Sequence, residues 1–440
     1  MKLNFKRTIC IGLAFMVISV FWGFYDQAIS YILKYEFGQA EMETNLIMSI
    51  DNVLALFLLP IFGALSDKTN TPYGKRTPYI VVGTVFSILF FIGMGFGVAT
   101  QKFWLFFAML FMTLLSMATF RSPAVALMPD LTPRGLRSRA NAIINIMGGV
   151  GSAFAMLVIM VLVRSEKNSD GSTAYIKGQN YWPVMLTVAG FMLVGLVIFL
   201  LTIKEKKLSE KLLASGELTA EDFIDEEAEE AKAHKGERLP RPVLKSLILI
   251  LLSVAFWYIA YNGMSTNLSR YCQEVMGKDL SGSSSYSLVT LVVTGVAMVP
   301  LFPISAKFGR KKTIIGGVII MMAAFLAGSF IRQGTPEILV YGMFSLVGIG
   351  WAAINVNSYP MVVEISRAGD VGKYTGYYYT FSMAAQVVTP LLSALLIETF
   401  GLGYTVLFPY SAIFCVLALV CMFFVKHGEA PKMAEQSKAN

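Results

Sequence analysis

Three charged side chains, Asp26, Asp51 and Arg121, lie within otherwise apolar stretches of this sequence. In a bilayer, a charge at such a position is costly, and it usually faces a polar cavity or another charge. A carboxylate in these surroundings pairs with a cation or takes up a proton, and an arginine offers five N–H donors in a planar fork. These residues predict that the protein handles a polar solute and a proton. A buried ion pair between Asp26 and Arg121 is the structural alternative.

The elements that position these charges are twelve apolar stretches, each close to the length of a helix that crosses a bilayer. Of the 440 residues, 55% are hydrophobic and only 15% are charged, and the mean hydropathy of +0.63 excludes an ordinary soluble domain. The sequence therefore predicts an all-α membrane protein. Its helices are expected near 8–32, 46–65, 79–99, 103–128, 139–163, 182–203, 243–264, 285–306, 314–331, 337–360, 374–396 and 403–425.

Lysine and arginine counts predict the orientation, because cytoplasmic loops carry an excess of these residues. With the N-terminus inside, cytoplasmic segments hold 27 of the 36 Lys and Arg residues and external segments hold 8, the remaining one being Arg121. We therefore expect a multi-pass protein of the cell inner (plasma) membrane with both termini in the cytoplasm. The same bias explains the net charge of +8 without a nucleic-acid partner.

The sequence carries no signature of catalysis. It has no phosphate-binding loop, no nucleophile elbow and no metal-ligand spacing, and its histidines, His234 and His427, fall in a loop and in the tail. Of the four cysteines only Cys272 is expected outside, so we expect no disulfide. We therefore expect that the protein is not an enzyme and has no cofactor. The same observations argue against transport driven by ATP.

The chain divides into two weakly related halves of six spans each. Matching residues recur at nearly constant offsets, since Asp130 matches Glu364 at 234 and Asn141 matches Gly376 at 235. Two such halves are typical of a transporter that binds its substrate near the middle of the bilayer. The expected parts are an N-terminal half at 1–203, a charged cytoplasmic linker at 204–242, a C-terminal half at 243–425 and a cytoplasmic tail at 426–440. A plain connector is the favoured interpretation of the linker, and a regulatory role is its alternative.

A family resemblance covers the layout of all twelve spans and is specific in its motifs in two segments, 60–80 and 120–145. Their motif residues are Gly63, Asp67, Gly74, Lys75, Arg76 and Pro78 in the first, and Pro123, Pro129, Asp130, Arg139 and Asn141 in the second. The pattern resembles the signature loop of the major facilitator superfamily, and within it the glycoside–pentoside–hexuronide:cation symporters and the sucrose-transporter-like proteins. This resemblance implies that helices 1, 4, 7 and 10 line a central cavity, so that Asp26 and Arg121 face it.

The sequence also differs from the family pattern at several positions. Sodium-coupled members of the branch have acidic residues where Ala55, Leu59 and Arg121 stand. We therefore expect no sodium site of that type and favour the proton as the coupling ion. By the same resemblance, Asp67 helps to latch the halves together, and Lys307 replaces the acid in the second copy of the loop. We therefore expect an asymmetric latch.

We predict three groups of site residues. The substrate-binding group comprises Asp26, Arg121, Asn141, Trp257, Tyr261, Asn262, Asn355 and Asn357. The cation-coupling group comprises Asp26 and Asp51. The gating group comprises Asp67, Arg76, Asp130, Arg139, Lys307 and Arg310. The alternative for each group is ordinary structure, because aromatic residues collect at membrane interfaces, amides join helices, and loop cations set topology.

Together these features predict a monomeric, proton-coupled sugar symporter of the lipid bilayer that works by alternating access. The cargo is expected to be a glycoside or disaccharide, with Asp26 carrying or gating the proton. Arg121 is expected either to clamp sugar hydroxyls or to act as the counter-charge of Asp26. An exporter of amphiphilic compounds on the same fold is one alternative, and a membrane sensor that transports nothing is another.

Overall fold

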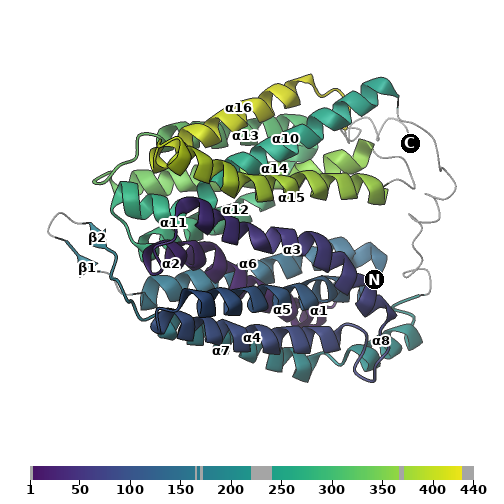
Figure 1. Cartoon of the computed structure of the whole chain (residues 1–440). Helices are drawn as coiled ribbons and strands as arrows, with labels where there is room; N and C mark the ends of the chain where they lie inside the picture. The colour runs from purple at the N-terminus through teal and green to yellow at the C-terminus, as the bar shows by residue number, and fades with distance from the viewer. Residues whose placement is uncertain (1–2, 164–165, 169–171, 220–239, 366–370, 429–440) are drawn as a thin grey trace. The chain divides into compact units, whose positions relative to one another are not determined.

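The computed structural model describes residues 3–428 apart from 164–165, 169–171, 220–239 and 366–370 (Figure 1). Most of the predicted linker and tail, at 220–239 and 429–440, therefore lies outside the described residues. The chain folds into two compact units. Unit 1 comprises Met1–Ser169, Thr173–Ile224 and Lys278–Ser285, and unit 2 comprises Asp170–Ser172, Asp225–Gly277 and Tyr286–Asn440.

Unit 1 is built from helices and one small pair of strands. Its elements are α1 (Phe5–Phe24), η1 (Tyr25–Ile29), α2 (Ser30–Tyr35), α3 (Glu41–Lys68), α4 (Thr77–Ala99), α5 (Phe103–Asp130), η2 (Arg134–Leu136), α6 (Arg137–Leu162), β1 (Glu166–Lys167), β2 (Thr173–Ala174), α7 (Trp182–Thr202) and α8 (Glu205–Ala214). The strands are antiparallel, with Glu166 opposite Ala174, and they were not predicted. Helix α8 lies inside the segment that was expected to be a plain linker.

The described part of unit 2 is helical throughout. Its elements are α10 (Arg241–Ser265), α11 (Leu268–Tyr271), η4 (Cys272–Met276), α12 (Leu280–Phe308), α13 (Arg310–Gly328), α14 (Glu337–Ile365), α15 (Val371–Ala394), η5 (Leu395–Thr399), η6 (Tyr404–Val406) and α16 (Leu407–Phe424). The first residues of α12, up to Ser285, belong to unit 1.

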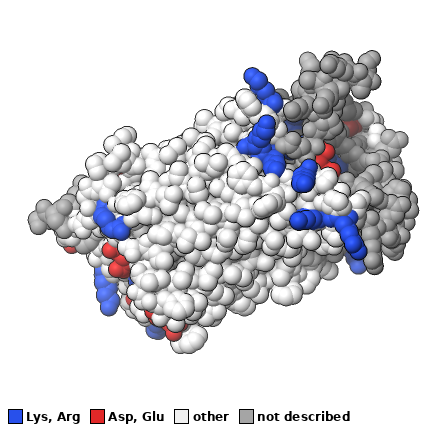
Figure 2. Space-filling view, turned by 90° about the horizontal axis from the view of Figure 1, so that it is seen from above, with Lys and Arg blue, Asp and Glu red and all other residues white. Residues whose placement is uncertain are grey.

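Twelve helices of the described residues are long and apolar enough to cross a membrane, which confirms the predicted all-α membrane fold. On the face drawn in Figure 2, the charged side chains lie toward the two ends, and the band between them is uncharged. Such a band is what a lipid-facing surface requires, because an unpaired charge in the hydrocarbon core is costly. The chain is therefore a multi-pass membrane protein.

The first span is not a regular α-helix. It runs from Phe5 to Tyr35, but between Tyr25 and Ile29 the backbone widens into the π-helical turn η1, which contains Asp26. Single π-turns inside α-helices are rare and occur frequently at functional sites. Tyr25 of this turn donates a hydrogen bond of 3.4 Å to the carbonyl of Met48, so the turn packs against α3 of unit 1.

Candidate functional site

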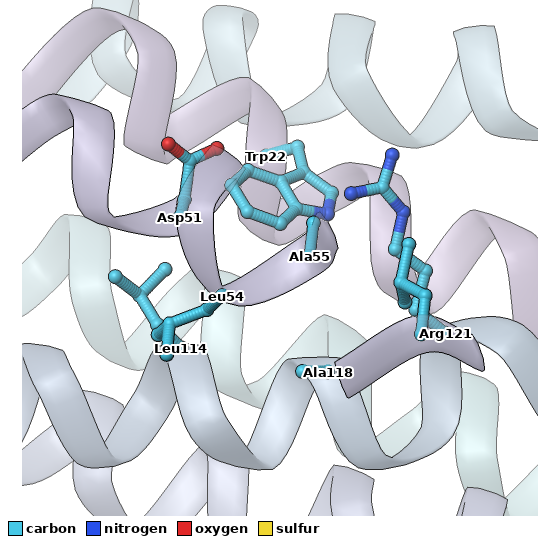
Figure 3. Close-up of a pocket in the computed structure, with 8 residues that line it drawn as sticks. Trp22, Asp51, Leu54, Ala55, Leu114, Ala118 and Arg121 are labelled. Atoms are coloured by element: carbon cyan, nitrogen blue, oxygen red, sulfur yellow. The ribbon is translucent and has the colours of Figure 1, made fainter. Parts of the chain in front are cut away.

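The three charges predicted to lie within spans belong to one region of unit 1. Asp26 lies on η1, Asp51 on α3 and Arg121 on α5. Asp51 and Arg121 line one small pocket, which is drawn in Figure 3. The other lining residues are Trp22, Leu54, Ala55, Leu59, Leu114 and Ala118. Three different helices therefore contribute to one small, mostly apolar chamber with two opposite charges in its wall.

Trp22 separates the two charges of this pocket. In Figure 3 the Asp51 carboxylate lies on one side of the Trp22 indole and the Arg121 guanidinium on the other. The central carbon of the guanidinium is 5.4 Å from the indole centroid, which is within the range of a cation–π contact. The Asp51 carboxylate accepts a hydrogen bond of 2.9 Å from the side-chain amide of Asn52. The indole therefore supports Arg121 without neutralising its charge.

The charges influence one another without forming ion pairs. Arg121 and Asp51 both act electrostatically on Asp26, and both aspartates act on Arg121. Among the described residues, however, no ion pair within 4 Å joins Arg121 to either aspartate. The predicted structural alternative, a direct Asp26–Arg121 pair, is thus not formed in this part of the chain. The guanidinium fork remains available for another partner.

Asp26 lies on the accessible face of its helix. Phe15, Ser19 and Trp22 share this face at helical spacing and are partly exposed, and Asp26 is exposed. Tyr25, beside Asp26 in the sequence, is only 1% exposed. Because Trp22 also lines the pocket with Arg121, this face of α1 and η1 connects the exposed aspartate with the pocket wall.

A second accessible face, on unit 2, is aromatic rather than charged. Tyr261 on α10 stacks on Trp351 of α14, with ring centroids 4.0 Å apart and planes 8° apart. Tyr258, also on α10, meets the same indole edge-on at 5.2 Å. All three rings are partly exposed. Trp351 was not predicted, although it lies four residues before Asn355 and thus on the same face of its helix.

Trp257 and Asn357 lie in the packed interior of unit 2 instead. Trp257 is 0% exposed, because a step of four residues from Tyr261 still turns a side chain by about 40° around the helix. The Asn357 side chain is 1% exposed and hydrogen-bonds Ser305 of α12 and the carbonyl of Ala353. Asn357 therefore joins helices within the unit, which was its structural alternative, whereas Trp257 packs in the hydrophobic core.

The remaining predicted amides differ in their surroundings. Asn355 is partly exposed and donates to the carbonyl of Trp351 at 2.9 Å. The side-chain nitrogen of Asn262 is buried without a hydrogen-bond partner among the described residues, so a polar group is required there to satisfy it. Asn141 is exposed at the beginning of α6. Asn262 and Asn355 are therefore the amides best placed beside the aromatic face.

The predicted gating residues of unit 1 form an ion-pair cluster around Arg76. Its Nε donates to Asp130 at 2.8 Å, and its terminal nitrogens donate to Asp67 and to the hydroxyl of Ser66. Lys75 adds a second ion pair to Asp130 at 3.2 Å. Burial lowers the pKa of Arg76, but its hydrogen bonds with Asp130 and Asp67 raise the pKa by more. Arg76 therefore stays charged at any physiological pH.

Unit 2 repeats this arrangement in reduced form. Arg310 pairs with Glu364 at 2.9 Å, and these residues follow Arg76 and Asp130 at the same offset of 234 in the sequence. Lys307 is exposed and lies against the ring of Phe308. Arg139 is exposed too, and the ion partners of Asp130 are Arg76 and Lys75 rather than Arg139.

Glu205 completes the cluster of unit 1 and was not predicted. It is the first residue of α8 and is only 4% exposed. Its carboxylate accepts the backbone N–H groups of Lys75, Arg76 and Thr77 at 2.7–3.1 Å, and the Thr77 hydroxyl at 2.7 Å. These donors begin helix α4, where a negative charge is stabilising. The start of the supposed linker therefore holds the loop that carries Arg76.

We expect Glu205→Ala to destabilise unit 1 by about 2 kcal/mol, because it leaves several buried N–H groups without an acceptor. The melting temperature of the purified protein should fall, and transport should slow as the Arg76 cluster loosens. Glu205→Gln keeps one acceptor oxygen, so its melting temperature should lie between those of the wild type and Glu205→Ala. Glu210→Ala, on the exposed side of the same helix, is the control. Equal melting temperatures for Glu205→Ala and Glu210→Ala would contradict the anchoring role.

The chain is similar in sequence to known transporters. A lactose permease from Lactobacillus helveticus is 23% identical over 347 residues, which cover 74% of this chain and 49% of the permease. An uncharacterised MFS-type transporter, YxiO, from Bacillus subtilis (strain 168) is 25% identical over 197 residues, 44% of each chain. The matches thus span about half the length of these relatives. They are too distant to transfer a substrate.

Solved structures share the fold. The inward-open xylose transporter XylE from E. coli superposes with a TM-score of 0.70 at 14% identity over 99% of both chains. A peptide transporter (POT) in complex with sulfate superposes with a TM-score of 0.69 at 15% identity over 96% of this chain and 95% of its own. At these identities the likeness shows the fold alone. The sequence pattern of one family matches residues 8–302 and 284–440, which together cover nearly the whole chain, and the chain therefore belongs to the Major Facilitator Superfamily.

Proposed function

We propose that this protein is a secondary active transporter that carries a sugar, as a glycoside or disaccharide, together with a proton by alternating access. One observation carries the proposal. Asp26, Asp51 and Arg121 gather within the spans of unit 1, and no ion pair among the described residues joins Arg121 to the aspartates. Holding separated charges at this depth is costly, so the arrangement is best explained by a polar cargo and a proton that complete it.

The aromatic face of unit 2 favours a sugar over other polar cargoes. Sugar rings present hydroxyl groups at their rims and apolar faces above and below. Arg121 offers donors for the hydroxyls, and in unit 2 the partly exposed Trp351 offers ring surface near Asn262 and Asn355. A lactose permease is among the relatives, and a xylose transporter shares the fold. The peptide transporters also share it, so the fold does not choose the cargo by itself.

The lining of the pocket favours the proton over sodium. Asp51 is its only carboxylate among the lining residues, and Leu54, Ala55, Leu59, Leu114 and Ala118 offer no side-chain oxygen. A metal cation of this kind needs several oxygen ligands, and the positive charge of Arg121 opposes it further. A proton needs a single carboxylate. Asp51 could thus take up a proton in the pocket, but we assign the coupling role to Asp26, because it is exposed on the accessible face of its helix, and keep Asp51 as the second carboxylate.

The ion-pair clusters around Arg76 and Arg310 fit the gates of such a cycle. They lie at the helix ends that we place at the cytoplasmic face of the cell inner membrane. We propose that these pairs, each within one half, rearrange as the two halves alternate. We expect the latch to be asymmetric, because Lys307 stands where the first copy of the loop has an acid, and because Glu205 anchors only the cluster of unit 1.

The proposal is tested with the purified protein in liposomes. Uptake of labelled monosaccharides, disaccharides, methyl glycosides and a dipeptide is measured with a pH gradient, with a sodium gradient and with neither. We expect at least one glycoside or disaccharide to accumulate only under the pH gradient. Accumulation of the dipeptide alone would contradict the sugar assignment, and accumulation driven by sodium would contradict the proton. Absence of flux for every solute would leave the family membership intact but remove the proposed function.

A further inference from the structure

The aromatic face of unit 2 contains one unusually close ring contact. Aromatic side chains prefer offset or edge-on arrangements with centroids about 4.5–7 Å apart. Tyr258 and Trp351 follow this rule at 5.2 Å and 82°. Tyr261 and Trp351 approach more closely than this range, with centroids 4.0 Å apart and planes 8° apart. The phenol of Tyr261 thus covers one face of the indole at contact distance.

The indole itself is held in place. Tyr258, which meets it edge-on, lies close to the hydroxyl of Tyr378 on α15 and interacts with it electrostatically. Tyr378 in turn contacts the hydroxyl of Ser358 on α14 at 2.9 Å. Tyr378 is 5% exposed and Ser358 is 0% exposed, so this chain of hydroxyl groups is a fixed part of the unit. These contacts link α14, which carries Trp351 and Ser358, with α10 and α15.

The stack is placed at an accessible position, unlike the interior aromatic residues. Trp351 and Tyr261 are both partly exposed, whereas Trp257, one turn away on α10, is fully buried. A flat ring packed on a rigid, accessible indole is the arrangement that a bound sugar or aryl ring adopts on tryptophan. Tyr261 fills that position with a ring of the protein.

We propose that the covered face of Trp351 is a binding subsite for the second ring of the transported glycoside, and that Tyr261 occupies this subsite until the ring displaces it. The inference rests on the proposed function, because it takes the cargo to be a glycoside. It adds the class of cargo that the subsite selects, namely glycosides whose second part is itself a ring. It also makes Tyr261 a competitor of the cargo rather than a contact.

The two roles of Tyr261 predict opposite effects of its removal. If Tyr261 only contacted the cargo, Tyr261→Ala would weaken binding. If it covers the subsite, Tyr261→Ala exposes the indole and strengthens binding of a ring. The gain is limited to the value of one aromatic stack, so we expect about a 3- to 10-fold change. Tyr261→Phe keeps the covering ring and should resemble the wild type.

The experiment uses phenyl and methyl versions of the same hexoside, with the transporter in liposomes, and compares their apparent affinities. Tyr261→Ala should raise the affinity for the phenyl hexoside and leave that for the methyl hexoside unchanged. Trp351→Leu should reduce the affinity for the phenyl hexoside to that for the methyl hexoside. Trp351→Phe retains a ring and should lose less of the affinity for the phenyl hexoside. It replaces the leucine variant in the comparison if that variant does not fold.

The outcomes separate this inference from the function on which it rests. Weaker binding of the phenyl hexoside by Tyr261→Ala would overturn the covering role. Equal losses for both hexosides in Trp351→Leu would overturn the subsite, while transport of hexosides by the wild type would keep the proposed function. If the wild type bound no hexoside in any of the common configurations, both proposals would fail together.

Discussion

Asp26→Asn should abolish accumulation of the sugar against its own gradient while downhill exchange of sugar continues. An asparagine resembles a protonated aspartate in shape but neither releases nor takes up a proton. One proton per sugar and a gradient of one pH unit supply about 1.4 kcal/mol, which drives up to about a tenfold accumulation. We expect this ratio to fall to one in the variant. The measurement is labelled sugar inside liposomes at steady state, with and without the pH gradient.

Two further variants show whether Asp26 is the coupling carboxylate. Glu43→Gln removes an exposed acid from the start of α3 and should leave accumulation unchanged. Asp51→Asn removes a charge that acts on Asp26 and Arg121, so it should weaken coupling without eliminating it. Full accumulation by Asp26→Asn would place the proton elsewhere. If Asp51→Asn lost accumulation completely while Asp26→Asn still accumulated sugar, proton coupling would be assigned to Asp51.

The spans themselves could be predicted from sequence because their cause is local. A stretch of apolar residues of sufficient length must form a helix in a bilayer, where every backbone group needs an internal partner. The ends were less predictable. Helix α3 runs from Glu41 to Lys68, well beyond the apolar stretch 46–65, because polar residues continue a helix wherever other contacts hold them. The π-turn η1 has no signal in the hydropathy pattern at all.

Charges inside the spans could also be identified from sequence, but their partners could not. Arg76 and Asp130 are 54 residues apart, and Glu205 is 129 residues from Arg76. No periodicity or local motif specifies such pairs. The same limit applies to Trp351, which meets α10 only when α10 and α14 pack together. Sequence reasoning chose Trp257 instead, because the boundary between packed and accessible faces depends on the neighbouring helices.

Arg121→Ala should weaken sugar binding by about 10- to 150-fold, the value of one or two hydrogen bonds from a charged donor. No ion pair of the described residues within 4 Å ties its guanidinium to Asp26 or Asp51. Its donors therefore need not be withdrawn from an internal partner before they meet a substrate. The contact with Trp22 at 5.4 Å keeps the side chain in position, which reduces the entropy lost on binding. The measurement is the dissociation constant of the sugar accumulated by the wild type. Val125→Ala, one turn further along α5 and exposed, is the matched control.

Arg121→Lys distinguishes the two roles that remain for this residue. Lysine retains the positive charge but lacks the planar fork that engages two oxygens at once. If Arg121 clamps sugar hydroxyls, the lysine variant should bind sugar nearly as weakly as the alanine variant and should keep the proton coupling. If Arg121 serves chiefly as the counter-charge of the aspartates, lysine should restore both affinity and accumulation. We expect the first outcome, because the guanidinium rests on the Trp22 indole rather than on a carboxylate. If Arg121→Ala and Arg121→Lys both bound sugar with wild-type affinity, neither the sugar clamp nor the counter-charge role would hold. Arg121 would then have only a structural role.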